Sequence, residues 1–363
     1  MKEEVRLMKG NEAVAHAAIR YGCDGYFGYP ITPQSEVLET LEALMPWETT
    51  GMVVLQAESE VAAINMVYGG AATGKAVMTS SSSPGISLKQ EGISYIAAAK
   101  LPALILNVMR GGPGLGTIQP SQADYFQATK GGGHGDYHLI VLAPSSVQEM
   151  VDFVGLGFDL SFKYRTPAMI LADGIVGQMM EKVVLPPYRP RRTDAEVRAQ
   201  CPWAASGREG LRKRNVVTSL ELESSKMEEI NHELQAIYKE IEANETRAEE
   251  IGVEDADYLI VAFGSIARIC DKARELAAEK GIKVGIIRPI TLWPFPKETV
   301  RKAAEGKKGI LCVELNAGQM IEDVRLAIHD SLPVEHFGRM GGIIPSPTEI
   351  VEALEQKLIG NKN

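Results

Sequence analysis

Residues 53–85 read VVLQAESEVAAINMVYGGAATGKAVMTSSSSPG, and this order of segments decides the fold. The apolar run that ends at Leu55 has the length of a strand, and Ala, Ile, Met and Val recur after it at helical spacing. A second apolar run, a run of serines and Pro84-Gly85 follow. Glu60 is therefore expected in the first turn of a helix, just past the carboxyl end of a strand. In an open parallel sheet, that edge is where ligands bind.

Three further apolar runs in the first half of the chain are expected to be strands of the same sheet. Polar residues follow each of them: Thr32 after the first, Ser80 to Ser83 after the second and Arg110 after the third. Because successive strands linked by helices are parallel, their carboxyl ends lie on one edge. We therefore expect these residues and Glu60 to converge on one rim. The three runs cover residues 25–29, 76–79 and 103–109.

The chain is long enough for two α/β units with a linker between them. Residues 1–190 form the first unit, in which Asn11 is expected to cap the first helix and Gly22 to end it. Residues 191–255 are linker-like and carry one amphipathic helix, while residues 256–363 again alternate strands and helices. The apolar stripe of the linker helix consists of Met227, Ile230, Leu234, Ile237 and Ile241.

Composition excludes several classes of protein. A net charge of -9 argues against nucleic-acid binding, and no apolar run is long enough to span a bilayer. The amino terminus has no apolar core of signal-peptide length, so we expect a cytoplasmic protein. The four cysteines include no CxxC pair, which argues against an iron–sulfur cluster or a zinc site made by this chain. They are expected to be buried thiols, and we expect no metal ligand here.

Each candidate residue also has a simpler structural interpretation. Glu60 is a residue that favours a helix N-terminus, and Ser80 to Ser83 are expected mainly to cap the next helix. Thr32 is consistent with a turn residue, and Arg110 with a surface ion pair. The glycine-rich loop 111–135 does not fit a dinucleotide-binding motif. In the motif GGGHGD at its end, His134 and Asp136 are expected to shape the loop rather than act as acid and base.

Several motifs in the same order resemble the α subunit of the 2-oxoacid:ferredoxin oxidoreductases, and most closely the branched-chain type that oxidises 3-methyl-2-oxobutanoate. The motifs are YPITPQSE, LQAESEVAAINMVYGGA, SSSSPGISL, VMRGGPGLG and GGGHGDY. The resemblance covers the first unit and extends more loosely to the second. It implies a thiamine-diphosphate-enzyme domain of the pyrimidine-binding type, built on a parallel sheet, followed by a smaller α/β domain like the transketolase C-terminal domain.

The resemblance also implies an activity and roles for individual residues. The enzymes of this family oxidatively decarboxylate a 2-oxoacid with coenzyme A to acyl-CoA and CO2, and pass two electrons to ferredoxin. By motif match, Glu60 is the catalytic carboxylate that hydrogen-bonds the aminopyrimidine ring of the cofactor. Thr32 matches the threonine that touches substrate and cofactor, with Pro30 and Ile31 beside it as cofactor-binding residues. Arg110 matches the arginine that meets the 2-oxoacid carboxylate, to which a planar guanidinium is suited.

One motif of thiamine enzymes is missing from the sequence. The GDG…NN motif, which binds Mg²⁺ and the diphosphate, is absent, because Gly135-Asp136 is followed by Tyr137 and no Asn-Asn occurs. The resemblance therefore implies a β subunit that carries the diphosphate-binding domain and Mg²⁺, and [4Fe-4S] clusters on partner subunits, one of them a small ferredoxin-like chain. It suggests a dimer of heterodimers. A 2-oxoglutarate or pyruvate enzyme, and a non-catalytic assembly subunit, remain as alternatives.

Overall fold

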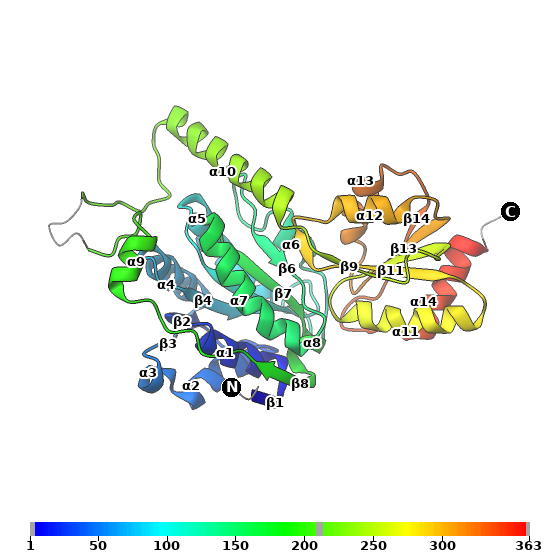
Figure 1. The fold of residues 1–363 in the computed structure, drawn as a ribbon, viewed down its shortest axis with the longest axis horizontal. Coiled ribbons are helices and arrows are strands. Elements are labelled where there is room, and N and C mark those ends of the chain that lie inside the picture. Colours follow the sequence, from blue (N-terminus) through cyan, green and yellow to red (C-terminus); the bar gives the residue numbers. More distant parts are fainter. Residues whose placement is uncertain (1–3, 208–212, 361–363) are drawn as a thin grey trace.

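The first unit is built on a seven-stranded sheet with helices on both faces (Figure 1). A computed structural model of the chain describes residues 4–207 and 213–360. Six of the strands are parallel to their neighbours, and only β12 at one edge is antiparallel. In spatial order the strands are β12 (Thr291–Trp293), β6 (Ile140–Leu142), β7 (Ala168–Asp173), β5 (Leu104–Met109), β4 (Val77–Ser81), β2 (Gly25–Gly28) and β3 (Val53–Gln56).

The central strands of this sheet are buried over their whole length. Strands β5 and β7 read LILNVM and AMILAD, and every residue of both is buried. Such near-continuous apolar runs are typical of parallel strands that are covered on both faces. The covering helices are α1 (Gly10–Arg20), α2 (Ser35–Leu44), α4 (Glu60–Ala72), α5 (Ser83–Ala98) and α7 (Val147–Tyr164), in which α1 packs on α2 and α7, and α4 packs on α5.

Shorter elements complete the first unit. Strands β1 (Glu4–Lys9) and β8 (Met180–Leu185) form a separate antiparallel pair beside α1. The short helices are α3 (Pro46–Thr49), α6 (Tyr125–Thr129) and α8 (Gly174–Gln178). The capping role predicted for Asn11 is wrong, because α1 begins at Gly10 and its N-cap is Lys9. Gly22, with φ of +75°, does follow the end of this helix as predicted.

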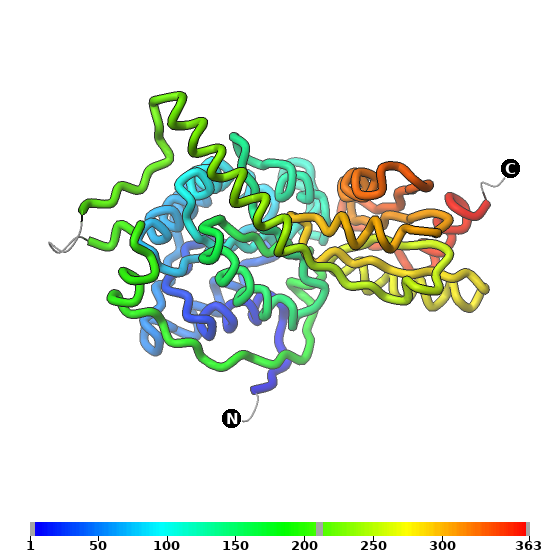
Figure 2. Tube along the Cα trace, turned by 45° about the horizontal axis from the view of Figure 1, so that its top comes forward, coloured from blue at the N-terminus to red at the C-terminus, as the bar shows by residue number. Residues whose placement is uncertain are grey.

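The stretch predicted as a linker packs on the first unit. It contains α9 (Asp194–Gln200) and the amphipathic helix α10 (Ser224–Asn244), which lies across the first unit in both Figure 1 and Figure 2. Of the predicted stripe, Leu234 and Ile241 are buried in the same core as the main sheet, so the stripe packs on its own chain. Arg191 also pairs with buried Asp24 at 2.9 Å, which fastens the linker to the start of β2.

The second unit is a five-stranded sheet with three parallel strand pairs and one antiparallel edge strand. Its order is β14 (Val334–Gly338), β13 (Gly309–Glu314), β10 (Tyr258–Val261), β11 (Val284–Pro289) and β9 (Ala248–Ile251). Its helices are α11 (Ser265–Glu279), α12 (Lys297–Ala304), α13 (Met320–Ile328) and α14 (Pro347–Leu354), followed by a π-helical turn, Glu355–Ile359. The predicted α/β alternation is present, and the limits predicted at residues 190 and 255 stay a prediction.

Buried polar contacts join the second unit to the carboxyl edge of the first sheet. Asp173, at the end of β7, accepts hydrogen bonds from the backbone nitrogen and the hydroxyl of Ser265, at 3.0 and 2.7 Å. Gln122 donates to the carbonyl oxygen of Phe263 at 2.8 Å. Burial raises the pKa of Asp173, and the two hydrogen bonds from Ser265 act against that rise. In the part of the chain that is described, no helix is both long and apolar enough to cross a membrane.

Candidate active site

Four neighbouring parallel strands deliver the predicted residues to one edge of the sheet. Strands β3, β2, β4 and β5 lie side by side in this order. Glu60 follows β3, Thr32 follows β2, the serine run ends β4, and Arg110 directly follows β5. The convergence predicted from the sequence is therefore confirmed. The roles of these residues in catalysis and binding stay predictions.

Glu60 is the first residue of α4, and its side chain is nearly buried, with 7% exposed. The helix is capped by Ser59, whose hydroxyl accepts from the backbone nitrogen of Ala62 at 3.2 Å, so Glu60 is not needed as the cap. Within residues 4–207 and 213–360 the Glu60 carboxylate has no hydrogen-bond partner. A buried carboxylate normally has partners, so this one is available to a group from outside the chain.

Gly85 makes room for the Glu60 carboxylate. A Cβ atom at residue 85 would lie 2.8 Å from Oε1 of Glu60 and closer still to the hydroxyl of Ser81. Only a glycine fits there without a shift of either neighbour. The Pro84-Gly85 pair in the sequence therefore serves a close approach between α5 and the carboxylate.

Thr32 is exposed, and it lies in a turn that is held in place by hydrogen bonds to its backbone. Pro30 and Ile31 are half-buried beside it, and the Thr32–Pro33 peptide bond is cis. The carbonyl oxygen of Pro33 accepts hydrogen bonds from the side-chain amides of Asn11 and Gln178, at 2.6 and 2.8 Å. The two amides hold the turn at the rim while the Thr32 side chain stays accessible.

Arg110 is buried and contacts the same turn. Its Nη1 donates to the carbonyl oxygen of Thr32 at 2.8 Å, and its Nη2 donates to that of Leu115 at 3.0 Å. Its Nε is buried without a partner. Among the described residues Arg110 forms no ion pair, so the surface ion pair considered from the sequence is wrong. A guanidinium has five N–H donors, so donors remain for an anionic ligand.

The serine run does not cap α5 with its side chains. Ser82 occupies the N-cap position, but its hydroxyl makes no capping bond. The Ser80 hydroxyl bonds Tyr26 at 2.6 Å, and the Ser83 hydroxyl donates to Asp124 at 2.6 Å. The hydroxyls of Ser81 and Ser82 are buried without a partner. The predicted capping role is therefore wrong, because most of these serines lie inside the sheet end or face the rim.

Lys89 is a buried cation that the sequence analysis missed. It is fully buried on α5, and its Nζ donates to the Thr79 hydroxyl at 2.5 Å and to the Ser80 carbonyl oxygen at 3.4 Å. Burial lowers the pKa of Lys89 to about 7, while the charge of Glu60 acts in the opposite direction. A signal was present in the sequence, since Lys89 is one turn from Gly85 and falls on the apolar face of its helix.

The loop residues His134 and Asp136 are exposed, and they form hydrogen bonds through their backbone carbonyl oxygens. The carbonyl oxygens of these two residues accept hydrogen bonds from Ser94 and Gln235, both at 2.8 Å. These contacts agree with the predicted loop-shaping role. The four cysteines are buried and free, as predicted, and burial raises the pKa of Cys23, Cys270 and Cys312.

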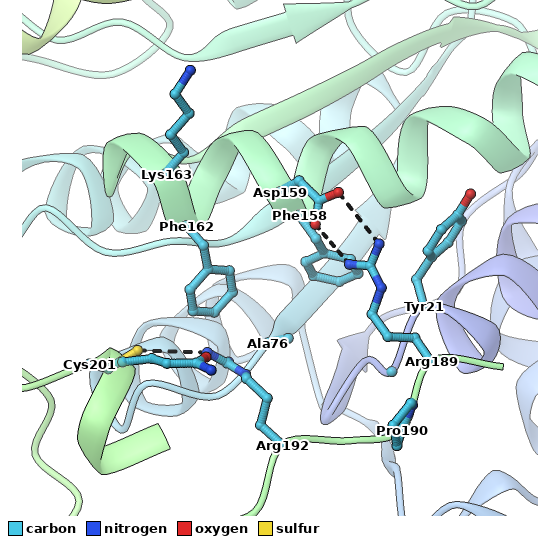
Figure 3. A pocket seen from close by; sticks show the side chains of 12 residues that line it. Tyr21, Ala76, Phe158, Asp159, Phe162, Lys163, Arg189, Pro190, Arg192 and Cys201 are labelled. Atoms are coloured by element: carbon cyan, nitrogen blue, oxygen red, sulfur yellow. Dashed lines mark hydrogen bonds and ion pairs between the residues drawn. The ribbon is translucent and has the colours of Figure 1, made fainter. Parts of the chain in front are cut away.

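The cavity drawn in Figure 3 lies at the opposite edge of the sheet from Glu60. It measures about 420 Å³ and includes Gly22 and Ala76, which precede β2 and β4. Its cations already have partners: Arg189 pairs with Asp159 at 2.7 Å, and Arg192 lies over the ring of Phe162. We therefore place the candidate site at the carboxyl edge.

Comparison with known proteins assigns both units to a family. Residues 16–249 match the family model described as "Pyruvate flavodoxin/ferredoxin oxidoreductase, thiamine diP-bdg", and residues 256–350 match "Pyruvate:ferredoxin oxidoreductase core domain II". The chain belongs to the 2-oxoacid:ferredoxin oxidoreductase family. Its first unit is thus the family's thiamine-diphosphate-binding domain.

Two relatives in this family differ in their named substrate. The chain is 49% identical to a ketoisovalerate oxidoreductase subunit VorB of Methanothermobacter marburgensis, over 99% of both chains. It is 37% identical to a 2-oxoglutarate synthase subunit KorA of Archaeoglobus fulgidus, over 98% of this chain and 100% of that one.

Solved structures support the fold. The 2-oxoglutarate:ferredoxin oxidoreductase from Magnetococcus marinus, solved with 2-oxoglutarate, coenzyme A and succinyl-CoA, superposes with a TM-score of 0.85 at 27% identity. The match covers 98% of this chain, which spans 66% of that chain. A split-gene transketolase has a TM-score of 0.59 at 12% identity, which shows a shared fold alone.

Proposed function

We propose that this chain is the α subunit of an oxidoreductase that converts the branched-chain 2-oxoacid 3-methyl-2-oxobutanoate and coenzyme A to acyl-CoA and CO2. Two electrons leave the substrate and reduce ferredoxin. The observation that carries the proposal is the buried Glu60 carboxylate without a partner, on the same rim as Thr32 and Arg110. The proposal places the enzyme in the cytoplasm.

The described residues fit the half of thiamine diphosphate that contains the aminopyrimidine ring. They supply a carboxylate without a partner, two buried hydroxyls without partners and a glycine that leaves space beside them. When bound, this cofactor supplies the carbanion chemistry that breaks the bond between the carbonyl and carboxylate carbons. Glu60 would accept a charge-assisted hydrogen bond from the ring, with Thr32, Pro30 and Ile31 beside it. Such a bond is worth about 1.5–3 kcal/mol.

Arg110 would bind the carboxylate of the substrate. Its guanidinium is held in place by the carbonyl oxygens of Thr32 and Leu115 and retains unused N–H donors. A planar guanidinium holds a carboxylate through two parallel hydrogen bonds, which fixes the orientation of the ligand. Thr32 would then lie between the substrate and the cofactor.

A branched-chain substrate is favoured over 2-oxoglutarate. The relatives named for ketoisovalerate are 49% identical to this chain, whereas that of Archaeoglobus fulgidus named for 2-oxoglutarate is 37% identical. The loop after Arg110 also presents the apolar side chains of Leu115 and Ile118, both exposed. An apolar surface suits an isopropyl group, whereas the distal carboxylate of 2-oxoglutarate needs a second cation.

Exposed apolar side chains on the elements next to Glu60 support a partner subunit over the rim. Val53 and Leu55 on edge strand β3, Val61 beside Glu60 and Leu88 on α5 are all exposed. Clustered exposed apolar side chains mark interaction surfaces. The proposed partner is a β subunit that carries the diphosphate-binding domain and Mg²⁺. A small ferredoxin-like subunit with [4Fe-4S] clusters would complete the enzyme, and the α and β chains would form a dimer of heterodimers.

Reconstitution tests this proposal. The α chain is combined with its partner subunits, thiamine diphosphate, Mg²⁺, coenzyme A and a reducible dye, and each 2-oxoacid is supplied in turn. The proposal predicts the highest kcat/KM with 3-methyl-2-oxobutanoate and no turnover by the α chain alone. A preference for 2-oxoglutarate or pyruvate would overturn the substrate assignment, and turnover by the isolated chain would overturn the shared site.

A further inference from the structure

Gln122 is a fully buried residue to which the proposed reaction assigns no role. It belongs to the first unit and lies between the loop that follows Arg110 and helix α6. Its backbone and its side-chain amide both form hydrogen bonds, and most of their partners belong to the second unit. Buried polar groups need such partners, so the position of Gln122 is tied to that of the second unit.

The partners of Gln122 lie where an open parallel sheet normally binds a ligand. In the second sheet, β10 pairs with β11 on one side and with β13 on the other, so the strand order reverses at β10. Ligands of such sheets bind in the cleft outside the carboxyl ends of the strands at this reversal. Phe263 follows the end of β10, and Leu315 directly follows β13. These two residues therefore mark the cleft.

Gln122 bridges the two strand ends and occupies the cleft. Its Nε2 donates to the carbonyl oxygen of Phe263 at 2.8 Å, and its Oε1 accepts from the backbone nitrogen of Leu315 at 3.2 Å. Its backbone nitrogen donates to the Leu315 carbonyl oxygen at 3.0 Å, and its own carbonyl oxygen accepts from the side-chain amide of Asn316 at 2.8 Å. A Cβ atom at Gly264 would lie 2.9 Å from Nε2 of Gln122, so a glycine leaves the room that the amide needs.

The segment held in this cleft is the end of the loop that starts at Arg110. The loop returns to its own base, where Arg110 and Pro120 form an antiparallel bridge. Gln122 comes two residues after Pro120. Within the loop, the carbonyl oxygen of Leu115 accepts a hydrogen bond from Nη2 of Arg110 at 3.0 Å. The contacts of Gln122 therefore fix the base of a loop that orients the guanidinium.

A second contact from the second unit reaches the same loop. Gly342 lies between β14 and α14, and a Cβ atom there would lie 2.2 Å from the Cβ of Gln119. The carbonyl oxygen of Gln119 accepts from the backbone nitrogen of Gly111 at 2.9 Å, which closes the loop. The second unit thus touches the loop base at Gln119 and holds the chain just beyond it at Gln122.

We propose that Gln122 is a positioning residue for Arg110, which fills the ligand cleft of the second unit and thereby holds loop 111–119 in the conformation that binds the 2-oxoacid. This inference rests on the proposed function, because it takes Arg110 as the group that binds the substrate carboxylate. The second unit then serves the active site by holding the substrate-binding loop. Such support matters because a misplacement of about 1 Å can cost a reaction about 100-fold.

The test uses the assembled complex with Gln122→Met, which nearly keeps the size of the side chain and removes its amide. With coenzyme A in excess, the KM for the 2-oxoacid is expected to rise about 10-fold, while kcat stays within about twofold of wild type. Gln148→Ala is the control, because its amide also bonds the backbone nitrogen and carbonyl oxygen of one residue, Val184, at 2.8 and 3.2 Å. This control should keep the wild-type KM.

A second measurement does not depend on activity. Hydrogen exchange of peptides from loop 111–119 is followed by mass spectrometry in the complex without substrate. The amides of Gly111 and Thr117 form hydrogen bonds inside the loop, at 2.9 and 2.8 Å, so they report whether it stays closed. Exchange in this loop should be faster in Gln122→Met than in wild type, and Gln148→Ala should match wild type.

Two glycines provide a second pair of variants if Gln122→Met does not assemble. Gly341 and Gly342 both have positive φ, of +66° and +98°, so an alanine strains the backbone at either position. Among the described residues nothing lies within 4 Å of a Cβ at Gly341, whereas a Cβ at Gly342 meets Gln119. Gly342→Ala should therefore raise the KM and speed exchange in the loop, and Gly341→Ala should do neither.

Each outcome decides the inference. A raised KM with faster loop exchange in Gln122→Met, or in Gly342→Ala alone of the glycine pair, supports it. A wild-type KM in Gln122→Met overturns it whatever the exchange shows, and so does a fall in kcat alone, which indicates only a smaller folded fraction. Equal behaviour of the two glycine variants also overturns it. A raised KM in Arg110→Lys with a wild-type KM in Gln122→Met rejects only the role of Gln122, whereas a wild-type KM in Arg110→Lys rejects the proposed role of Arg110.

Discussion

Arg110 donates a hydrogen bond of 2.8 Å to the backbone carbonyl oxygen of Thr32, although 78 positions separate the two residues in the chain. The bond links the end of β5 to the turn after β2, with β4 lying between these strands. This one hydrogen bond therefore fixes the position of two residues of the candidate site relative to each other. A change at Arg110 is expected to affect the Thr32 turn as well as the bound substrate.

The first prediction concerns Arg110→Lys. Lysine keeps the positive charge, but it cannot hold two carbonyl oxygens and a carboxylate in one plane. With about 1.5–3 kcal/mol for a hydrogen bond to a charged group, kcat/KM for the 2-oxoacid should fall about 10- to 100-fold. Steady-state kinetics of the complex measure this. Arg301→Lys, at an exposed ion pair on α12, is the control and should behave like wild type.

The second prediction concerns Gly85→Ala and its matched control Gly69→Ala. A Cβ at residue 85 meets Glu60 and Ser81, whereas nothing lies within 4 Å of a Cβ at residue 69. Gly85→Ala should therefore displace the carboxylate and lower turnover by about 10-fold or more. A tenfold loss corresponds to about 1.4 kcal/mol of lost transition-state stabilisation. Gly69→Ala should keep full activity and stabilise α4 by about 0.5–1 kcal/mol. Equal activities of the two variants would show that the position of Glu60 at Gly85 does not matter.

The third prediction concerns stability against pH. Burial lowers the pKa of Lys89 from 10.5 to about 7 in the folded chain. Between these values the unfolded chain binds a proton that the folded chain does not, so this group makes the free energy of unfolding rise with pH. The contribution is up to about 1.4 kcal/mol per pH unit. Urea unfolding from pH 7 to 10 should show this rise in the wild type and a flatter curve in Lys89→Met.

An exposed lysine provides the control for the pH measurement. Lys226, on the exposed face of α10, pairs only with Glu223 at 2.6 Å among the described residues. Lys226→Met should follow the wild-type curve. If Lys89→Met shows the same slope as wild type, Lys89 is not the group whose proton is lost on folding.

The arrangement of the rim was predictable from the sequence because it follows from general rules. Apolar runs of strand length, linked by helical segments, make parallel strands, and polar residues at their ends must share an edge. This reasoning placed Glu60, Thr32 and Arg110 correctly. Their roles came from motif resemblance and stay proposals.

Features that depend on tertiary contacts were not predictable in this way. Asparagine is a residue type that favours the N-cap position, but the side-chain amide of Asn11 instead donates to the distant carbonyl oxygen of Pro33. Lys89 was missed because a lysine is normally taken as exposed, and only the packed structure shows its partner Thr79. Strand β12 directly follows β11 of the second sheet in the chain, yet it pairs with β6 of the first sheet, and no local pattern indicates that pairing.

The central claim is that the Glu60 carboxylate acts in decarboxylation at a site shared with a partner subunit. The most direct measurement is the rate of 2-oxoacid decarboxylation by the assembled complex with Glu60→Gln, together with subunit assembly by size-exclusion chromatography. We predict that the rate falls by orders of magnitude while assembly is unchanged, because glutamine keeps the shape and loses the charge. Wild-type turnover in an assembled Glu60→Gln complex would contradict the account.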